Sequence, residues 1–332
     1  MAIKILRLTA VLCLAVMAGG MMRGTAAAEQ QEQRIDIGGY RINSVLVPRP
    51  AGADLPPLVF IHGAIANLRD PMVAFRTRLE GRAEMLFVDR PGHGGSDRGG
   101  PENDVPDGQA DAVAAVMKAR GISRAIIVSH SFGGAVAASF ALRHKEMVAG
   151  LLFLSPAVYP YGGDTAWYYK AAKAPVTGWL FSGIVAPTVG LAFIDSATKA
   201  VFAPNPRPPG YISQTGTLSA LRPTAFRSNA IDIANLSDAL GRMAPKYPSI
   251  RAPTVIITGD RDGIVSPKVH ALHLARDIRG ATLVEIHNLG HRPDYIVTDV
   301  AIAAIEKLAG KKRDLQQLAR VAEARIAGDK AD

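Results

Sequence analysis

The most informative stretch of the sequence is Ala125-Ile126-Ile127-Val128-Ser129-His130-Ser131-Phe132-Gly133-Gly134. A short apolar run passes directly into a turn of small residues, and the segment that follows is typical of a helix. The turn matches the pattern G-x-S-x-G of a nucleophile elbow, in which a strained strand-to-helix turn exposes the central serine, here Ser131. Ser129 replaces the first glycine and is small enough for the close approach of strand and helix. A plain serine cap of a helix is the alternative interpretation.

The same combination of an apolar run and a turn recurs along the chain. Runs rich in Val, Ile and Leu occur at 57–61, 84–88, 124–128, 150–154, 254–257 and 282–286. They lack polar alternation, as strands buried on both faces of a parallel sheet do. Helix candidates lie between them at 109–119, 134–144, 267–278 and 297–308. The pattern predicts an α/β fold whose active site gathers at the carboxyl ends of the strands.

A serine nucleophile needs a base, and the base needs an acid that orients it. His291 follows the run at 282–286, and Asp262 follows the run at 254–257. The chain order Ser, Asp, His, with each residue after a strand, predicts a catalytic triad of Ser131, Asp262 and His291. Asp260 is a rival for the acid, and capping of its own turn is its other possible role.

The oxyanion formed during acyl transfer needs donors, usually two backbone N–H groups. The residue after the nucleophile, Phe132, supplies the first in an elbow of this kind. We expect the second from the loop His62-Gly63-Ala64-Ile65, at Ala64, because an amide donor does not depend on its side chain. A plain loop is the alternative. We expect His62, His93 and His130 to brace the turns around this site.

Taken together, these motifs resemble the α/β-hydrolase family, in its lid-bearing, haloperoxidase- and esterase-like branch. The matching pieces span about residues 58 to 293: His62-Gly63, Asp89-Arg90-Pro91-Gly92-His93-Gly94-Gly95-Ser96, the elbow, the Asp262 loop and Gly290-His291. The resemblance implies an α/β-hydrolase fold, with a mostly parallel central sheet flanked by helices and a helical lid inserted before the acid-bearing strand. It also implies a serine nucleophile with neither metal nor organic cofactor. Serine rather than aspartate at position 131 argues against epoxide and halide chemistry.

The alternation of strands and helices stops between about residues 157 and 253. This segment holds both tryptophans, most of the tyrosines and several Gly and Pro breaks. We therefore predict a hydrolase core at 29–156 and 253–310, a helical lid at 157–252, and a basic C-terminal helix or tail at 311–332. Within the lid, Tyr168, Trp179 and Phe181 are candidates for lining the substrate site, and ordinary lid core is their alternative.

The first 28 residues have the features of an export signal. Lys4 and Arg7 precede an apolar run at 8–20, and small residues at 25–28 form an Ala-x-Ala cleavage site. The run is shorter than the ~20 apolar residues of a membrane span. We expect cleavage after Ala28 and export to a periplasm or the medium. Membrane anchoring by an uncleaved segment 1–28 is the alternative.

Composition excludes several classes of protein. The chain has 332 residues, 48% of them hydrophobic and 20% charged, which is typical of a globular rather than a disordered protein. A single cysteine allows neither an internal disulfide nor a cysteine-rich zinc module. The net charge is +9, but no basic arm with interleaved aromatics indicates nucleic-acid binding. His270 and His273 share a helical face without a carboxylate or thiol that would complete a metal site.

The sequence predicts a serine hydrolase that cleaves an ester of a fairly apolar small molecule through an acyl-enzyme. Cleavage of an amide or a carbon–carbon bond by the same triad is an alternative, because specificity lies in the lid. A hydrolase-like receptor with little turnover is another. The natural substrate and the oligomeric state stay open.

Overall fold

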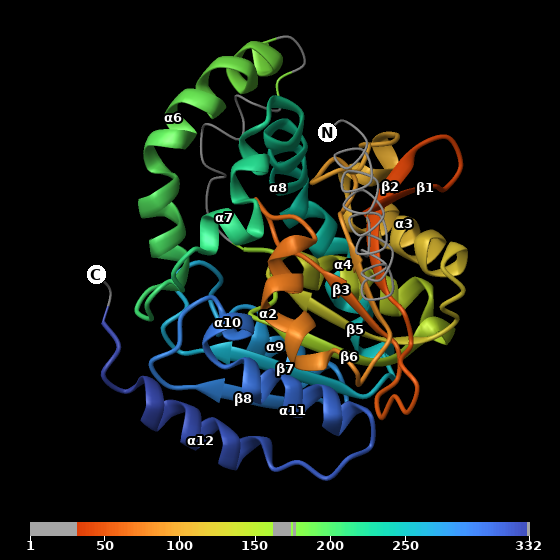
Figure 1. Cartoon of the computed structure of the whole chain (residues 1–332), viewed down its shortest axis with the longest axis vertical. Coiled ribbons are helices and arrows are strands. Elements are labelled where there is room, and N and C mark those ends of the chain that lie inside the picture. Colours follow the sequence, from red (N-terminus) through yellow and green to blue (C-terminus); the bar gives the residue numbers. More distant parts are fainter. Residues whose placement is uncertain (1–31, 162–173, 175–176, 331–332) are drawn as a thin grey trace, which may run out of the picture. The chain divides into compact units, whose positions relative to one another are not determined.

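The computed structural model describes residues 32–161, 174 and 177–330 (Figure 1). The predicted export signal and Tyr168 lie outside these residues. The strands and helices described below belong to the unit Gln33–Asp332.

An eight-stranded sheet organises this unit, with the strand order β1-β2-β4-β3-β5-β6-β7-β8. The strands are β1 (Gln33–Asp36), β2 (Arg41–Val47), β3 (Leu58–Ile61), β4 (Met85–Val88), β5 (Ala125–His130), β6 (Val148–Leu154), β7 (Thr254–Gly259) and β8 (Thr282–Ile286). β2 runs antiparallel to both β1 and β4, and the pairs from β4 to β8 are parallel. The predicted α/β fold with a mostly parallel sheet is therefore confirmed, and the predicted strands occur within a few residues of their expected ends.

The central strands are mainly apolar because helices cover both faces of the sheet, and polar residues such as Ser129 and His130 of β5 lie at the strand ends. Along β3, Val59 and Ile61 belong to one apolar core, and Leu58 and Phe60 belong to the other. Successive side chains of a strand point to opposite faces, so a strand between two cores needs apolar residues at every position.

The helices divide between these two cores. The core that contains Val59 also holds buried residues of α3 (Pro106–Ala119), α4 (Phe132–Arg143) and α9 (Ala271–Asp277). The core that contains Phe60 holds buried residues of α2 (Arg69–Leu79), α11 (Thr298–Leu308) and α12 (Leu315–Ile326), and α10 (Pro293–Ile296) packs against it. Two short 3₁₀ helices, η1 (Pro101–Asp104) and η2 (Lys145–Met147), lie in the connections.

The predicted C-terminal helix or tail contains α12, which is a packed part of the unit. Its buried residues Leu315, Ala319, Ala322 and Ile326 recur at the spacing of one helical face. Figure 1 shows α12 along the β8 edge of the sheet, beside α11, and it contacts both elements.

The chain leaves the sheet between β6 and β7, and we call residues 155–253 the insertion. Its described helices are α6 (Thr177–Phe202), α7 (Tyr211–Thr215) and α8 (Pro223–Met243), with 3₁₀ helices η3 (Thr217–Leu221) and η4 (Ala244–Ser249). In Figure 1, α6, α7 and α8 gather on one side of the strands, and α12 lies on the other. Among the described helices, none combines the length and the apolar character that crossing a membrane requires.

Candidate active site

Ser131 lies in the turn between β5 and α4 with φ 54° and ψ −120°. A non-glycine residue at such an angle is strained and needs surroundings that hold it in place. Two glycines allow the turn to close. A Cβ at Gly133 would lie 2.4 Å from the carbonyl oxygen of Ile61, and a Cβ at Gly134 would lie 2.7 Å from the Cβ of Pro156. The helix therefore approaches the end of β3 and the segment after β6 so closely that both positions need glycine.

Ser129 occupies the place of the first glycine of the elbow pattern. It is buried, and its hydroxyl donates to the carbonyl oxygen of Leu152 on β6 at 3.3 Å. The hydroxyl that serine has and glycine lacks therefore has a hydrogen-bond acceptor on the neighbouring strand. The elbow forms with Ser129 in this position.

Ser131, His291 and Asp262 lie in one chain of hydrogen-bonding distances. Nε2 of His291 is 2.9 Å from Oγ of Ser131, and its Nδ1 is 2.8 Å from Oδ2 of Asp262. The three residues follow β5, β8 and β7, so parallel strands of one sheet deliver them to the same end, that of the strand carboxyl termini. All three are buried.

Asp262 is held as an ionised acceptor. Its Oδ1 accepts the backbone N–H groups of Ile264 at 2.9 Å and Val265 at 2.8 Å. Burial alone would raise the pKa of Asp262, but the hydrogen bond and charge of His291, with these two N–H groups, lower it below its ordinary value. An ionised Asp262 keeps the proton of His291 on Nδ1, and Nε2 is then free to accept the proton of Ser131.

Asp260, the rival acid, faces a different histidine. It lies 2.6 Å from Nδ1 of His287 and accepts the backbone N–H of Asn288 at 2.8 Å. Both Asp260 and His287 are exposed. The structure places Asp262, and not Asp260, beside His291.

The two expected oxyanion donors border the same site. Phe132 is the first residue of α4, where a backbone N–H has no acceptor within the helix. The loop that carries Ala64 touches the nucleophile, since a Cβ at Gly63 would lie 3.2 Å from the Cβ of Ser131. Within residues 32–161, 174 and 177–330, neither the Phe132 nor the Ala64 amide donates a hydrogen bond to another protein group. Both N–H groups are therefore available to an oxygen beside Ser131.

Arg90 holds the peptide that presents the Ala64 N–H. The carbonyl of this peptide, that of Gly63, accepts from Nη2 of Arg90 at 3.0 Å and lies 2.8 Å from Nδ1 of His62. Hydrogen bonds at the carbonyl end fix the orientation of the amide and polarise its N–H. The Arg90 guanidinium also lies 4.3 Å from the ring centroid of Phe132. Arg90 belongs to the motif Asp89-Arg90-Pro91-Gly92, but nothing in the sequence indicates this role.

The charge of Arg90 is balanced from the insertion. Asp232 of α8 lies 2.7 Å from Nη1 of Arg90 and 2.7 Å from Nη1 of Arg98. Arg90 and Asp232 are completely buried. This ion pair ties the insertion to the loop that follows β4.

Three further histidines brace the surrounding loops. Burial lowers the pKa of His62, His93 and His130 well below the usual value, so their rings are neutral. Nε2 of His62 accepts the backbone N–H of Arg90 at 3.0 Å, and Nε2 of His130 is 2.8 Å from the carbonyl oxygen of His291. His130 thus connects the elbow to the loop of the base.

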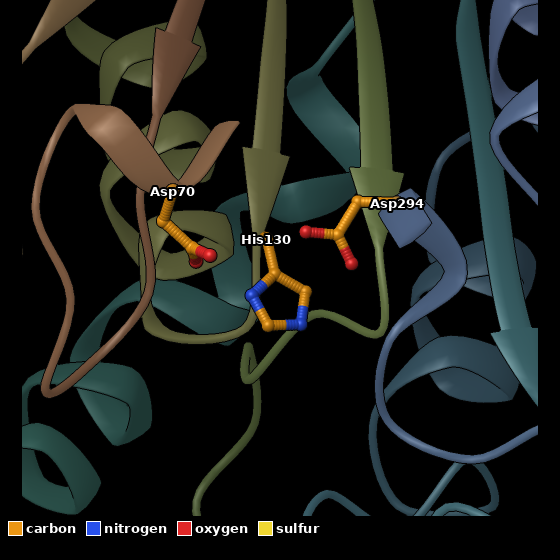
Figure 2. Close-up of side chains that lie close together, drawn as sticks. All are labelled: Asp70, His130 and Asp294. Carbon is orange, nitrogen blue, oxygen red and sulfur yellow. The ribbon is translucent and has the colours of Figure 1, made fainter. Parts of the chain in front are cut away.

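Asp70, His130 and Asp294 lie close together, with one candidate ligand atom of each within 4.8 Å of the others. Figure 2 shows the two carboxylates on either side of the His130 ring. Arg292 supplies the positive charge here, because its Nη2 lies 2.9 Å from Asp70 and 2.7 Å from Asp294. Both carboxylates pair with the protein's own guanidinium, which fits a buried ion-pair network better than a divalent metal site.

A cavity of about 950 Å³ opens beside Ser131. Its walls are mostly apolar and come largely from the insertion, including Phe193, Val201, Phe202, Phe226, Ile233 and Leu236. Of the predicted substrate-lining residues, Phe181 lines this cavity. Trp179 is 53% exposed, does not line the cavity, and has the Arg227 guanidinium 5.3 Å from its ring centroid.

Comparisons with known proteins agree with this architecture. Residues 56–293 match the family model of the alpha/beta hydrolase fold. The chain is 26% identical over 278 residues, 82% of its length and 93% of the relative, to a 2-(acetamidomethylene)succinate hydrolase of Mesorhizobium japonicum. It is 28% identical over 249 residues, 72% of its length and 88% of the relative, to a pimeloyl-[acyl-carrier protein] methyl ester esterase of Chromobacterium violaceum. A solved esterase from Thermogutta terrifontis matches with TM-score 0.64 and 21% identity, covering 84% of this chain and 99% of that one.

Proposed function

The chain belongs to the alpha/beta hydrolase fold family of enzymes, and we propose that it cleaves an ester of a fairly apolar small molecule through a serine acyl-enzyme. The observation that carries the proposal is the chain of hydrogen-bonding distances Ser131–His291–Asp262, located at an apolar cavity. The relative named as a methyl ester esterase supports ester chemistry.

In this proposal, Oγ of Ser131 attacks the ester carbonyl while Nε2 of His291 takes the hydroxyl proton. The N–H groups of Ala64 and Phe132 stabilise the oxyanion, and Asp262 stabilises the charged imidazole. His291 then donates its proton to the leaving alcohol, which departs as the acyl-enzyme forms. A water molecule, deprotonated by His291, hydrolyses that acyl-enzyme and restores Ser131.

The apolar walls support an apolar substrate. Each buried CH₂ contributes about 0.8 kcal/mol, which corresponds to about a fourfold change in kcat/KM when the contact is made in the transition state. We expect kcat/KM for p-nitrophenyl esters to rise with acyl length from acetate until the cavity is filled. Equal kcat/KM for acetate and hexanoate would contradict the apolar assignment.

The nucleophile is tested with a fluorophosphonate probe, followed by peptide mass spectrometry. We expect an adduct on Ser131 that disappears in Ser131→Ala. Ser139→Ala is the matched control, because Ser139 lies on α4 and its hydroxyl bonds Asp107 away from the site. Folded protein without an adduct on Ser131 would refute the proposal and favour a receptor with little turnover. An adduct without ester turnover would direct the search to amides and diketones.

We propose also that residues 1–28 are removed during export, on the basis of their basic, apolar and Ala-x-Ala pattern. The mass of the protein recovered from the cell envelope or medium tests this. A mass that begins at Glu29 supports export with cleavage, and a full-length mass in the membrane fraction supports anchoring instead.

A further inference from the structure

We infer that the cavity contains a polar subsite at His270, which donates a hydrogen bond to a second, uncharged oxygen of the substrate, separate from the ester group that is cleaved. This inference rests on the proposed function, because it assigns the cavity to the substrate. It specifies the substrate further, as an apolar ester that also carries a keto, ether or second ester oxygen.

The surroundings of His270 fix which ring nitrogen carries the proton. Backbone N–H groups of Val158 and Tyr159 both donate to Nδ1, at 3.2 and 3.1 Å. A nitrogen that accepts two N–H groups uses its lone pair and carries no hydrogen, so the ring proton is on Nε2. Burial lowers the pKa of His270 to about 4, and the ring is therefore neutral near pH 7.

The Nε2–H group of His270 has no partner among the described residues. The residue is only 4% exposed and lines the cavity beside Ser131. Nδ1 of His130 is fully enclosed without a partner, whereas Nε2 of His270 is not enclosed and so reaches the open space of the cavity. Water in the cavity can accept from this N–H group, and an oxygen of a bound molecule can take the place of that water.

Three other polar side chains of the cavity already have partners within the protein. The Tyr211 hydroxyl pairs with Asp70 and Arg292, and the Thr198 hydroxyl donates to the carbonyl of Ile194. Thr217 pairs with Thr215. His270 differs from these residues because its donor is both fixed in direction and unused.

The subsite lies close to the reacting serine. The carbonyl of Ser131 accepts the N–H of Ala157, and the next N–H, that of Val158, donates to His270. His270 is also joined to the loop after Asp262, since its N–H donates to the carbonyl of Ser266 at 3.0 Å. Ser131 and His270 therefore line one cavity and are connected through adjacent residues, so one substrate can contact both.

The preference for an uncharged oxygen follows from the local electrostatics. The donor is a neutral imidazole in a mostly apolar cavity, where an unpaired carboxylate would pay a large desolvation cost. Asp262 is close enough to act on the charge of His270, so a second anion would be repelled there. A keto, ether or ester oxygen accepts the hydrogen bond without either cost.

The test uses p-nitrophenyl esters in pairs that differ by one carbonyl in place of one methylene, such as 4-oxopentanoate against pentanoate and 5-oxohexanoate against hexanoate. The measured quantity is the ratio of kcat/KM within a pair, divided by the same ratio for hydroxide-catalysed hydrolysis. We expect about a tenfold preference for the oxo ester in the best pair, which is the effect of about 1.4 kcal/mol from one hydrogen bond. We expect this preference to disappear in His270→Phe, which keeps a ring but has no donor.

The ratio cancels any loss of folded or active protein, because both esters meet the same sample. His273→Phe is the matched control, since His273 is exposed and bonds the carbonyl of Val269. A preference that survives in His270→Phe, or the absence of preference in every pair, would overturn the inference and indicate that water alone occupies the subsite. Plain esters that are hydrolysed without such a preference refute only this inference, whereas failure to hydrolyse any ester or to label Ser131 refutes the proposed function.

Discussion

Replacement of Asp262 by asparagine tests the proposed triad at the point where the structure is most specific. The asparagine oxygen would remain on the backbone N–H groups of Ile264 and Val265, because only an acceptor fits there. Its amide nitrogen would then face Nδ1 of His291, at the 2.8 Å now occupied by a carboxylate oxygen. Two N–H donors cannot share this contact, so His291 would move its proton to Nε2.

An Nε2–H group facing Ser131 cannot accept the serine proton. A wrong tautomer of this kind lowers kcat by about 10⁴ in a serine protease, which corresponds to about 5.4 kcal/mol in the barrier. We expect a similar loss for Asp262→Asn. The unfolding free energy should change far less, because asparagine is the same size and keeps the two backbone hydrogen bonds of Asp262.

The assay is kcat and KM on a p-nitrophenyl ester, with the unfolding free energy measured in urea on the same samples. Asp260→Asn is the matched control, because that carboxylate contacts the exposed His287 instead, and we expect its kcat to stay within about twofold. Loss of activity in Asp260→Asn with retention in Asp262→Asn would refute the assignment of the acid. Equal, small losses in both variants would refute a mechanism that depends on the His291 tautomer.

Three further predictions concern the elbow, Arg90 and the buried histidines. In Gly133→Ala the new Cβ would meet backbone oxygens of Ile61 and His62 at 2.4 and 2.8 Å. We therefore expect the free energy of unfolding, measured in urea, to fall by about 3 kcal/mol or more. Gly241 lies on α8, and a Cβ there would meet nothing within 4 Å. Gly241→Ala should therefore raise the free energy of unfolding by up to about 1 kcal/mol, and equal stability of the two variants would contradict the packing argument. Arg90→Lys keeps a positive charge for Asp232 but loses the fork that reaches the carbonyls of His62 and Gly63, so we expect kcat to fall at least about tenfold with KM little changed. Arg98→Lys contacts the same Asp232 without touching that loop, and an equal fall in kcat there would assign the effect to the ion pair alone. His62, His93 and His130 have lowered pKa values and stay neutral in the native state, whereas the unfolded chain takes up their protons as the pH falls below about 6.5. The unfolding free energy should therefore decrease from pH 7 to pH 5, by up to about 1.4 kcal/mol per pH unit for each histidine. An unfolding free energy that does not change over this pH range would contradict the assignment of neutral, buried histidines.

The strands that position the site were accessible from the sequence because they are buried on both faces. Such strands are continuous apolar runs, and the fully buried β3 and β4 lie within the predicted runs 57–61 and 84–88. β2 was not predicted. Its Asn43 and Ser44 are buried, but Asn43 bonds Asp89 and Ser44 bonds Arg120, so the strand lacks a continuous apolar run.

The positions of the candidate catalytic residues could be inferred from their order after the strands, whereas the residues that support them could not. Nothing local shows that Arg90 is buried, because its partner Asp232 is 142 positions away in the chain. The orientation of Trp179 could not be inferred either. Helical spacing shows which residues share a face but not whether that face meets a cavity or solvent, and Trp179 is exposed.

The ion pair between the insertion and the core limits how this enzyme can acquire new specificities. The walls of the cavity come largely from the insertion, so recombination that exchanges this segment would alter recognition while leaving Ser131 and His291 in place. Any incoming segment must also bring a carboxylate to the position of Asp232. Without it, Arg90 would be a buried cation lacking its counterion, at a cost of about 3–5 kcal/mol. A replacement segment can therefore bring a new substrate specificity to this fold only if it also carries this carboxylate.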